Sequence, residues 1–295
     1  MKIAYIGKFN HLHDEEYIAQ AFEYLGHTII RIPISAGVQD MRVTLETHAP
    51  DIILFAKWNW PVDLEKTITE LRRNGTKLVC WMFDLYFGYE REWQVKNFKM
   101  FKADYVFSTD GGHADKWKEY GVNHYCVRQG IIPSECYIAK TDREPKYEVV
   151  FVGSNNPLFP ERKRINDEIA KEFKFKWFGS FNSNEIRGIA LNELYANTKI
   201  VIGDSFYSPN YWSNRVVETL GRGGFLIHQE VDGLKEEYPH IVTYKRGDIE
   251  DLKAKIRYYI EHDAERRALI QKNLNWVKEN YTVTKKVEEI LKIIQ

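Results

Sequence analysis

The sequence has few cysteines, no long apolar segment and no net charge, and each of these shortages excludes a class of protein. Three cysteines occur among 295 residues, and none of them forms a Cys-x-x-Cys pair. An odd, unclustered set predicts neither a disulfide framework nor a zinc site, and a reducing cytoplasm fits it best. The longest apolar runs are far shorter than a membrane span, so we expect no integral membrane contact.

The charges balance, with 42 Lys and Arg residues against 42 Asp and Glu residues. A neutral total argues against indiscriminate binding to nucleic acid or to anionic membranes. The N-terminal MKIAYIG predicts a strand that leads into a loop, not a secretory signal peptide. The residues that are abundant point to packed cores, because 44% are hydrophobic and 14% aromatic. This length suits two domains of ordinary size.

Short apolar runs alternate with polar-apolar segments of helical spacing, which predicts parallel sheets covered on both faces. The strands expected first are Lys2–Gly7, Thr28–Ile34, Ile52–Ala56, Leu78–Phe83, Tyr105–Ser108 and Tyr125–Val127, and the helices between them include Glu15–Leu25, Leu64–Asn74, Glu92–Lys102 and His113–Tyr120. The charged segment 140–146 contains a proline and lacks apolar periodicity, and the strand pattern restarts at Val149. We therefore expect a first domain at 1–140, a second at 147–280 and a terminal helix within 281–295.

The segment from Lys199 to Gln229 is the most informative part of the chain. It contains a buried strand, a polar turn, a short helix, a glycine break and a second buried strand. At about 100° per residue, one arc of the helix carries Arg215, Glu218, Thr219 and Arg222, and the opposite arc carries Val216, Val217 and Leu220. Ser213 can cap this helix, and the free N–H groups at its start favour an anion. The pattern predicts a site for a nucleoside diphosphate beyond the strand ends.

The same residues carry a resemblance to a known family. The segment resembles the nucleotide-sugar-binding core of GT-B glycosyltransferases, particularly the CgeB-like group, in which Ser and Arg precede a Glu, a glycine-rich stretch and an apolar strand. Those positions here are Ser213, Arg215, Glu218, Gly223-Gly224 and Phe225–Ile227. Retaining enzymes of the glycogen-synthase type have a further Glu eight positions before the second, where this chain has Asn210. The resemblance therefore carries over only Glu218, as a ribose contact.

The resemblance implies an α/β GT-B fold: two Rossmann-like domains with parallel sheets, a cleft between them and a C-terminal helix that returns to the first domain. It implies transfer of a sugar from a nucleotide-sugar, with a UDP-sugar as the favoured donor and retention as the favoured outcome. Diphosphate recognition needs free backbone donors and a cation within reach. The donor-binding residues expected on this basis are Gly153, Ser154, Arg162, Lys163, Ser213, Arg215 and Glu218.

The first domain is expected to supply the acceptor side. Asp84 and Asp110 each follow a predicted strand, so both belong at the edge where parallel sheets bind ligands. His13 lies in the loop after the first strand, and inverting GT-B enzymes often use a His from that loop as the base. Asp84, His13 and Asp110 are therefore the candidate catalytic residues. Trp58 and Trp60 follow the third strand and are candidates for stacking on an acceptor.

The expected donor is a nucleotide-sugar that serves as a substrate, and neither a cofactor nor a metal is expected. The chain lacks any Asp-x-Asp, the usual metal–nucleotide element of the other major glycosyltransferase fold. The acceptor can be a glycan, a small molecule, a protein or a hydroxylated base in phage DNA, and the last requires Arg91, Lys96, Lys99 and Lys102 to gather. A sugar-nucleotide epimerase of the same fold and a two-lobed binding protein remain as alternatives.

Overall fold

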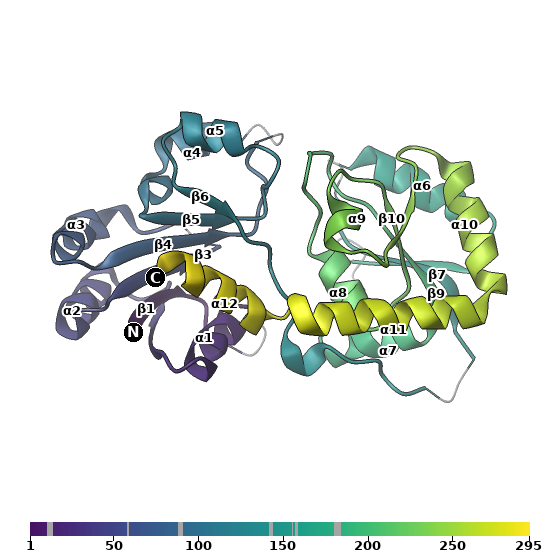
Figure 1. Ribbon diagram of the computed structural model, residues 1–295, viewed down its shortest axis with the longest axis horizontal. Coiled ribbons are helices and arrows are strands. Elements are labelled where there is room, and N and C mark those ends of the chain that lie inside the picture. Colours follow the sequence, from purple (N-terminus) through teal and green to yellow (C-terminus); the bar gives the residue numbers. More distant parts are fainter. Residues whose placement is uncertain are drawn as a thin grey trace. The chain divides into compact units, whose positions relative to one another are not determined.

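The computed structural model describes residues 1–10, 14–57, 59–87, 91–141, 144–154, 156, 159–179 and 184–295. These residues form two compact units, each built around its own parallel sheet (Figure 1). The first unit comprises Met1–Gln129 and Val283–Gln295, and the second comprises Gly130–Thr282. Two parallel α/β units confirm the predicted fold class. In the described part of the chain, every helix is too short or too polar to cross a membrane.

The sheet of the first unit has six parallel strands in the order β2-β1-β3-β4-β5-β6. The strands are β1 (Lys2–Gly7), β2 (Thr28–Pro33), β3 (Ile52–Ala56), β4 (Lys77–Met82), β5 (Tyr105–Ser108) and β6 (His124–Cys126). Successive side chains of a strand point to opposite faces, so Ile3 and Tyr5 enter one apolar cluster while Ala4 and Ile6 enter another. Both faces are therefore buried, as the continuous apolar runs predict.

Helices cover both faces of this sheet. One face carries α1 (Asp14–Tyr24) and α12 (Val283–Ile294). The other carries α2 (Val38–His48), α3 (Glu65–Arg73), α4 (Glu92–Asn97) and α5 (Ala114–Glu119), with the 3-10 turns η1 (Val62–Leu64) and η2 (Lys99–Lys102). The apolar stripe of α12 is buried along its length, and Lys77 Nζ donates to the carbonyl of Ile294 over 2.6 Å. The last helix, yellow in Figure 1, is thus part of the first unit.

The second unit repeats this plan with five parallel strands in the order β11-β10-β9-β7-β8. They are β7 (Tyr147–Val152), β8 (Phe175–Phe178), β9 (Thr198–Gly203), β10 (Leu226–Gln229) and β11 (Val242–Tyr244). One face packs against α6 (Pro160–Ala170) and α10 (Ile249–Glu261). The other packs against α7 (Ile189–Ala196), α8 (Arg215–Gly221), α9 (Leu234–Glu237) and α11 (Asp263–Asn280).

The structure differs from the sequence predictions at one boundary and in one helix. The second unit begins at Gly130, before the predicted linker. Ile131 explains the shift, because its side chain is fully buried and its N–H donates to the carbonyl of Tyr281 over 2.9 Å. The helix predicted at Glu92–Lys102 divides into α4 and η2 at Phe98, whose backbone is extended (φ −85°, ψ 123°).

Candidate functional site

The carboxyl ends of β7 and β9 lie next to each other in the second sheet, and the segments that follow them form the centre of the candidate site. The turn Gly153-Ser154 follows β7, and Asp204-Ser205 follows β9. Both strands are apolar and buried, so the first polar side chains after them emerge at the same edge. Ligands of parallel α/β sheets bind beyond this edge.

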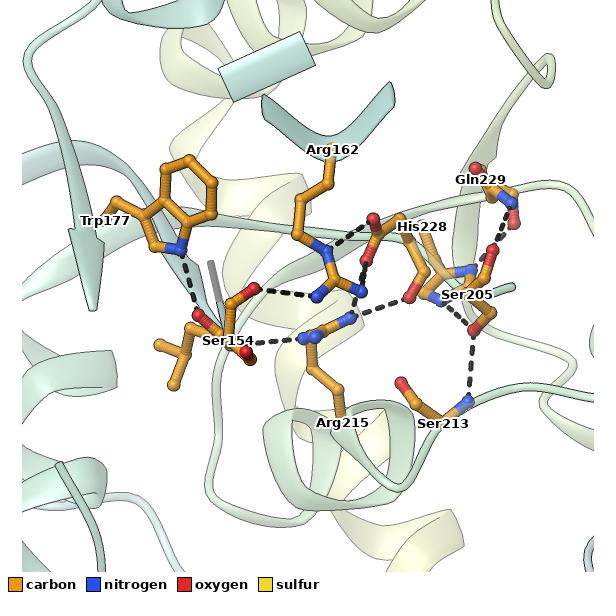
Figure 2. Close-up of polar contacts among 11 residues, drawn as sticks. Ser154, Arg162, Trp177, Ser205, Ser213, Arg215, His228 and Gln229 are labelled. Atoms are coloured by element: carbon orange, nitrogen blue, oxygen red, sulfur yellow. Dashed lines mark hydrogen bonds and ion pairs between the residues drawn. The ribbon is translucent and has the colours of Figure 1, made fainter. Parts of the chain in front are cut away.

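Arg162 of α6 connects the two segments. Its Nε and Nη2 donate to the two carboxylate oxygens of Asp204 over 2.8 and 3.0 Å, and its Nη1 donates to the carbonyl of Ser154 over 2.8 Å (Figure 2). Only 8% of the Arg162 side chain and 13% of the Asp204 side chain are exposed. A bidentate pair of this kind fixes orientation as well as contributing energy.

Arg215, the first residue of α8, approaches the same carboxylate from another direction. Its Nη1 donates to Oδ1 of Asp204 over 3.0 Å and to the Asp204 carbonyl over 2.7 Å, and its Nε donates to the carbonyl of Val152 over 2.7 Å. Figure 2 shows both guanidinium groups directed at one carboxylate. Because two cations share one anion, the cluster keeps one excess positive charge.

The two arginines decide the charge state of Asp204. Burial alone raises the pKa of this carboxyl group, but Arg215 and Arg162 outweigh burial and leave the pKa below its usual value. Asp204 is therefore ionised at neutral pH. Removing Asp204 would leave both buried guanidinium groups without a counter-charge, so the two arginines depend on this carboxylate.

Two glycines allow the loops to approach this closely. A Cβ at Gly153 would collide with the guanidinium of Arg215 and with the ring of Phe151, and a Cβ at Gly179 would collide with the carbonyl of Gly153. Neither glycine has a positive φ, so the requirement is space. Trp177 Nε1 donates to the Gly153 carbonyl over 2.9 Å and holds the turn in place (Figure 2).

The start of α8 differs from the prediction. Asn214, not Ser213, occupies the N-cap position, and it makes no side-chain cap bond. The backbone N–H of Ser213 donates to Ser205 Oγ over 3.0 Å. Among the residues that the structure describes, the buried hydroxyl oxygens of Ser213 and Ser154 have no hydrogen-bond partner. Two unsatisfied hydroxyl groups thus belong to the two segments that the sequence assigns to the donor.

Lys163 does not join the cluster. It forms an ion pair with Asp167 over 2.5 Å, and 64% of its side chain is exposed. Consecutive helical residues point about 100° apart, so Arg162 faces the sheet while Lys163 faces solvent. In this arrangement Arg162 alone of the two belongs to the cluster, and the contact of Lys163 with the donor diphosphate stays a prediction.

Glu218 lies one turn after Arg215 on α8 and has a different partner. Its Oε2 accepts a hydrogen bond from Arg222 Nε over 2.8 Å, and 21% of its side chain is exposed. Thr219, predicted on the same arc, is fully buried. The helix therefore separates its polar side chains into two groups, with Arg215 at the strand ends and Glu218 beside Arg222.

Asp204 and a buried polar group next to it were not predicted from the sequence. Ser205 Oγ lies 3.2 Å from Nε2 of His228, and Gln229 Nε2 donates to the Ser205 carbonyl over 2.9 Å. Burial lowers the pKa of His228 to about 4, so this imidazole is neutral at pH 7. An Asp-Ser pair directly after an apolar strand was a visible signal, but its partners lie on segments far away in the sequence.

The family comparison covers this whole site. Residues 142–292 match the model of a family described as glycosyl transferase-like, a range that contains β7, α6, β9 and α8. The chain belongs to the glycosyl transferase-like family. No curated protein matches the sequence.

Solved structures match this glycosyltransferase over its full length at low identity. Sucrose-phosphate synthase from Thermosynechococcus elongatus is 12% identical, with a TM-score of 0.64 over 100% of this chain and 99% of that chain. A trehalose-6-phosphate protein from E. coli, bound with UDP-2-fluoro glucose, is 9% identical, with a TM-score of 0.65 over 99% and 98%. An α,α-trehalose-phosphate synthase (UDP-forming) from Burkholderia xenovorans is 9% identical, with a TM-score of 0.65 over 100% of both chains. These likenesses confirm the GT-B fold, while the CgeB-like subgroup stays a prediction.

Among the acceptor-side residues predicted for this glycosyltransferase, Asp84 is accessible. It follows β4, 61% of its side chain is exposed, and its Oδ2 accepts from Arg91 Nη1 over 3.0 Å. His13 and Trp58 lie outside the described residues. Trp60 is only 9% exposed and packs edge-on against Phe55 in the core, so it does not present the stacking surface that was expected.

Asp110 lies after β5 but does not face solvent. It is fully buried, and its Oδ2 accepts from the backbone N–H groups of Tyr86 and Phe87 over 3.1 and 3.0 Å. Its Oδ1 lies 2.8 Å from His113 Nδ1. A carboxylate enclosed in this way does not touch a substrate, so the expected catalytic role of Asp110 is replaced by one in which it fixes the loop after β4 and the ring of His113.

Three of the four basic residues named for a DNA acceptor gather in one hollow of the first unit. Lys96, Lys99 and Lys102 line it together with Arg72, while Arg91 pairs with Asp84. Lys99 forms an ion pair with Glu65, and Arg72 pairs with Asp104 over 2.6 Å. Much of the positive charge is thus already compensated. In the described part of the chain, no group of three or more His, Cys, Asp or Glu side chains could hold a metal ion.

Proposed function

We propose that this glycosyltransferase moves a sugar from a nucleoside-diphosphate sugar, with UDP as the carrier, to an acceptor hydroxyl, with retention and without a metal. The observation that carries the proposal is the pair of arginines at the carboxyl ends of β7 and β9. Arg162 and Arg215 together carry one positive charge more than Asp204 neutralises. Charge that develops on a departing diphosphate is stabilised by fixed cations and N–H groups at such a site.

The roles follow from the contacts. Arg162 and Arg215 hold the turn Gly153-Ser154 against the end of β9 through three backbone carbonyls. The donor diphosphate then binds at this braced edge, where the unsatisfied hydroxyl groups of Ser154 and Ser213 supply hydrogen bonds. Glu218 accepts from the ribose, as the family resemblance implies. Arg162 and Arg215 thus hold the loops in place and also supply the positive charge for the diphosphate.

Two solved structures support the donor and the stereochemistry. The E. coli relative was solved with UDP-2-fluoro glucose bound, and another trehalose-6-phosphate synthase structure addresses enzymatic glycosyl transfer with retention, at a TM-score of 0.66 and 11% identity. On the acceptor side we propose that the first unit binds a glycan, a small molecule or modified DNA, with Asp84 and His13 as candidate catalytic groups.

Titration calorimetry with UDP in the presence of a chelator tests the donor assignment. Wild-type protein should bind UDP, and Arg215→Lys should bind about tenfold more weakly, because a charge-assisted fork is replaced by a point charge. Arg164→Ala is the matched control, since Arg164 lies on α6 but is half exposed and pairs with exposed Glu161. Equal affinity of a folded Arg215→Lys variant and wild type would refute the site.

Turnover then tests the reaction. We expect release of free UDP from UDP-sugars, slowly with water and faster with an acceptor, and a product whose anomeric configuration matches that of the donor. Interconversion of two UDP-sugars without release of UDP would instead identify an epimerase. A product of inverted configuration would contradict retention and leave the donor site intact.

A further inference from the structure

Arg222, immediately after α8, is a buried cation whose three guanidinium nitrogens all donate hydrogen bonds. Only 4% of its side chain is exposed. Its Nε donates to Glu218 Oε2 over 2.8 Å, its Nη1 donates to Asn192 Oδ1 over 2.5 Å and to the Gly188 carbonyl over 3.1 Å, and its Nη2 pairs with Glu135. A planar guanidinium held at all three nitrogens cannot rotate without breaking several charge-assisted bonds.

The partners of Arg222 come from separate segments that hold one another. Glu135 belongs to the 3-10 turn η3 (Pro133–Glu135), and Asn192 belongs to α7. Asn192 Nδ2 in turn donates to the carbonyls of Glu135 and Tyr137, both over 2.8 Å. The partners of Arg222 other than Glu218 are therefore hydrogen-bonded to one another, and together they fix the guanidinium in one orientation.

That orientation determines where Glu218 points. Arg222 lies four residues after Glu218, so the two side chains meet on one face of the helix. Burial opposes the charge of Arg222, but Glu218 and Glu135 outweigh burial and raise its pKa, so it remains a cation. Arg222 thus fixes one carboxylate oxygen, while 21% of the Glu218 side chain stays accessible to a ligand.

The spacing along α8 matches the parts of a nucleotide. Arg215 and Glu218 are three residues apart, a rise of about 4.5 Å along the helix. A carboxylate repels a diphosphate but accepts hydrogen bonds from the two hydroxyl groups of a ribose next to it. Holding that carboxylate in advance lowers the entropy lost on binding.

We propose that Arg222 is a positioning residue for nucleotide recognition, and that it orients Glu218 to accept hydrogen bonds from the ribose hydroxyl groups of the donor. This inference rests on the proposed function, because it requires a nucleoside diphosphate at the edge of the second sheet. It adds a specificity-determining network, made of Arg222, Asn192 and Glu135, that selects a ribonucleotide over a nucleotide without ribose hydroxyl groups.

The test compares the binding of UDP with that of 2′,3′-dideoxy-UDP, measured by calorimetry. Wild-type protein should prefer UDP by about tenfold to a hundredfold, the value of hydrogen bonds to a charged group. Glu218→Gln and Arg222→Ala should each lose most of this preference, through weaker UDP binding alone. Affinity for the dideoxy form should stay at the wild-type value, because the diphosphate contacts are untouched.

Two further variants separate positioning from stability. Arg222→Lys keeps a charge but cannot make the fork, so it should also reduce the preference, and Glu135→Gln removes the opposite ionic partner if Arg222→Ala fails to fold. Arg266→Ala is the matched control: its side chain is 6% exposed, pairs with Asp263 and donates to the carbonyl of Tyr259. It should lower the melting temperature and leave the preference unchanged.

The outcomes are distinguishable. If wild type binds neither nucleotide, the proposed function fails, and this inference fails with it. If wild type binds UDP but folded Arg222→Ala and Arg222→Lys keep the full preference, or lose affinity equally for both nucleotides, the positioning role is refuted and the donor site stands.

Discussion

In each unit an aspartate just after an interior strand is removed from water, and the two carboxylates are stabilised by different means. In the first unit Asp110 accepts from two backbone N–H groups and contacts one imidazole. In the second unit Asp204 is bound by two guanidinium groups. Both side chains lie at the carboxyl edge of a parallel sheet, and both are almost removed from water.

The groups that surround each carboxylate determine whether the strand end fixes a loop or keeps charge for a ligand. Two backbone N–H groups and one imidazole satisfy Asp110, and no guanidinium pairs with it among the described residues, so this carboxylate fixes its own loop. Arg162 and Arg215 more than neutralise Asp204, so the second edge keeps excess positive charge that an anion can use. The edge with surplus charge is the one to which the donor is assigned.

A second pair of residues allows the same comparison. Ser108 Oγ lies 2.8 Å from His124 Nε2 in the first unit, and Ser205 Oγ lies 3.2 Å from His228 Nε2 in the second. In each case the His belongs to the strand next to the one that the Ser ends or follows. Burial lowers the pKa of both imidazoles to about 4.

The largest effect is expected from breaking the ionic cluster. Asp204→Asn should lower the free energy of unfolding by about 3–5 kcal/mol, because the buried guanidinium groups of Arg162 and Arg215 both lose their counter-charge. Urea denaturation followed by tryptophan fluorescence measures the change. The control is Arg187→Ala, which removes an exposed pair with Glu185 and should cost at most about 1 kcal/mol. Similar losses in the two variants would show that the cluster is not interdependent.

Acid should weaken both units through their buried histidines. The folded pKa of His228 is about 4, below the unfolded value of about 6.5, so the unfolded state takes up the proton first. Neutral His228 therefore makes its full contribution to the free energy of unfolding above pH 6.5. As the pH drops towards 4, the protein loses about 3 kcal/mol of this contribution. Denaturation at several pH values should show a shallower slope in His228→Gln and in His124→Gln. An unchanged slope in both would contradict the assignment.

The smallest change in stability is expected from two serines that lie side by side in space, Ser205 and Ser213. Ser205→Ala removes the acceptor of the Ser213 N–H and the partner of His228, and should cost about 1–3 kcal/mol. Ser213→Ala removes a hydroxyl group without a partner and should change stability by less than about 0.5 kcal/mol. Ser213→Ala should nevertheless weaken UDP binding. Unchanged UDP binding would remove Ser213 from the donor site.

Part of the candidate site could be predicted from the sequence because a local pattern carries it. Short stretches of sequence show three of its features: the apolar strand before Asp204, the turn Gly153-Ser154, and the spacing of Arg215 and Glu218 on one helix. The predicted strands lie within a residue or two of the observed β1 to β6. The predictions that the structure does not support concern side chains whose partners are distant in sequence. Asp110 is an example, because it is enclosed by a loop more than twenty positions earlier in the chain.

By itself, the sequence determined the two parallel sheets, the helices on their faces and the edge at which polar residues emerge, because hydrophobic periodicity acts along the chain over a few residues. Tertiary structure alone decided that Arg162 and Arg215 share Asp204, that Trp60 is buried, and that Lys163 faces solvent. It also decided that Glu135 and Asn192 hold Arg222. These facts depend on which side chains meet across long stretches of chain, and a buried charge is assigned its role by the groups that surround it.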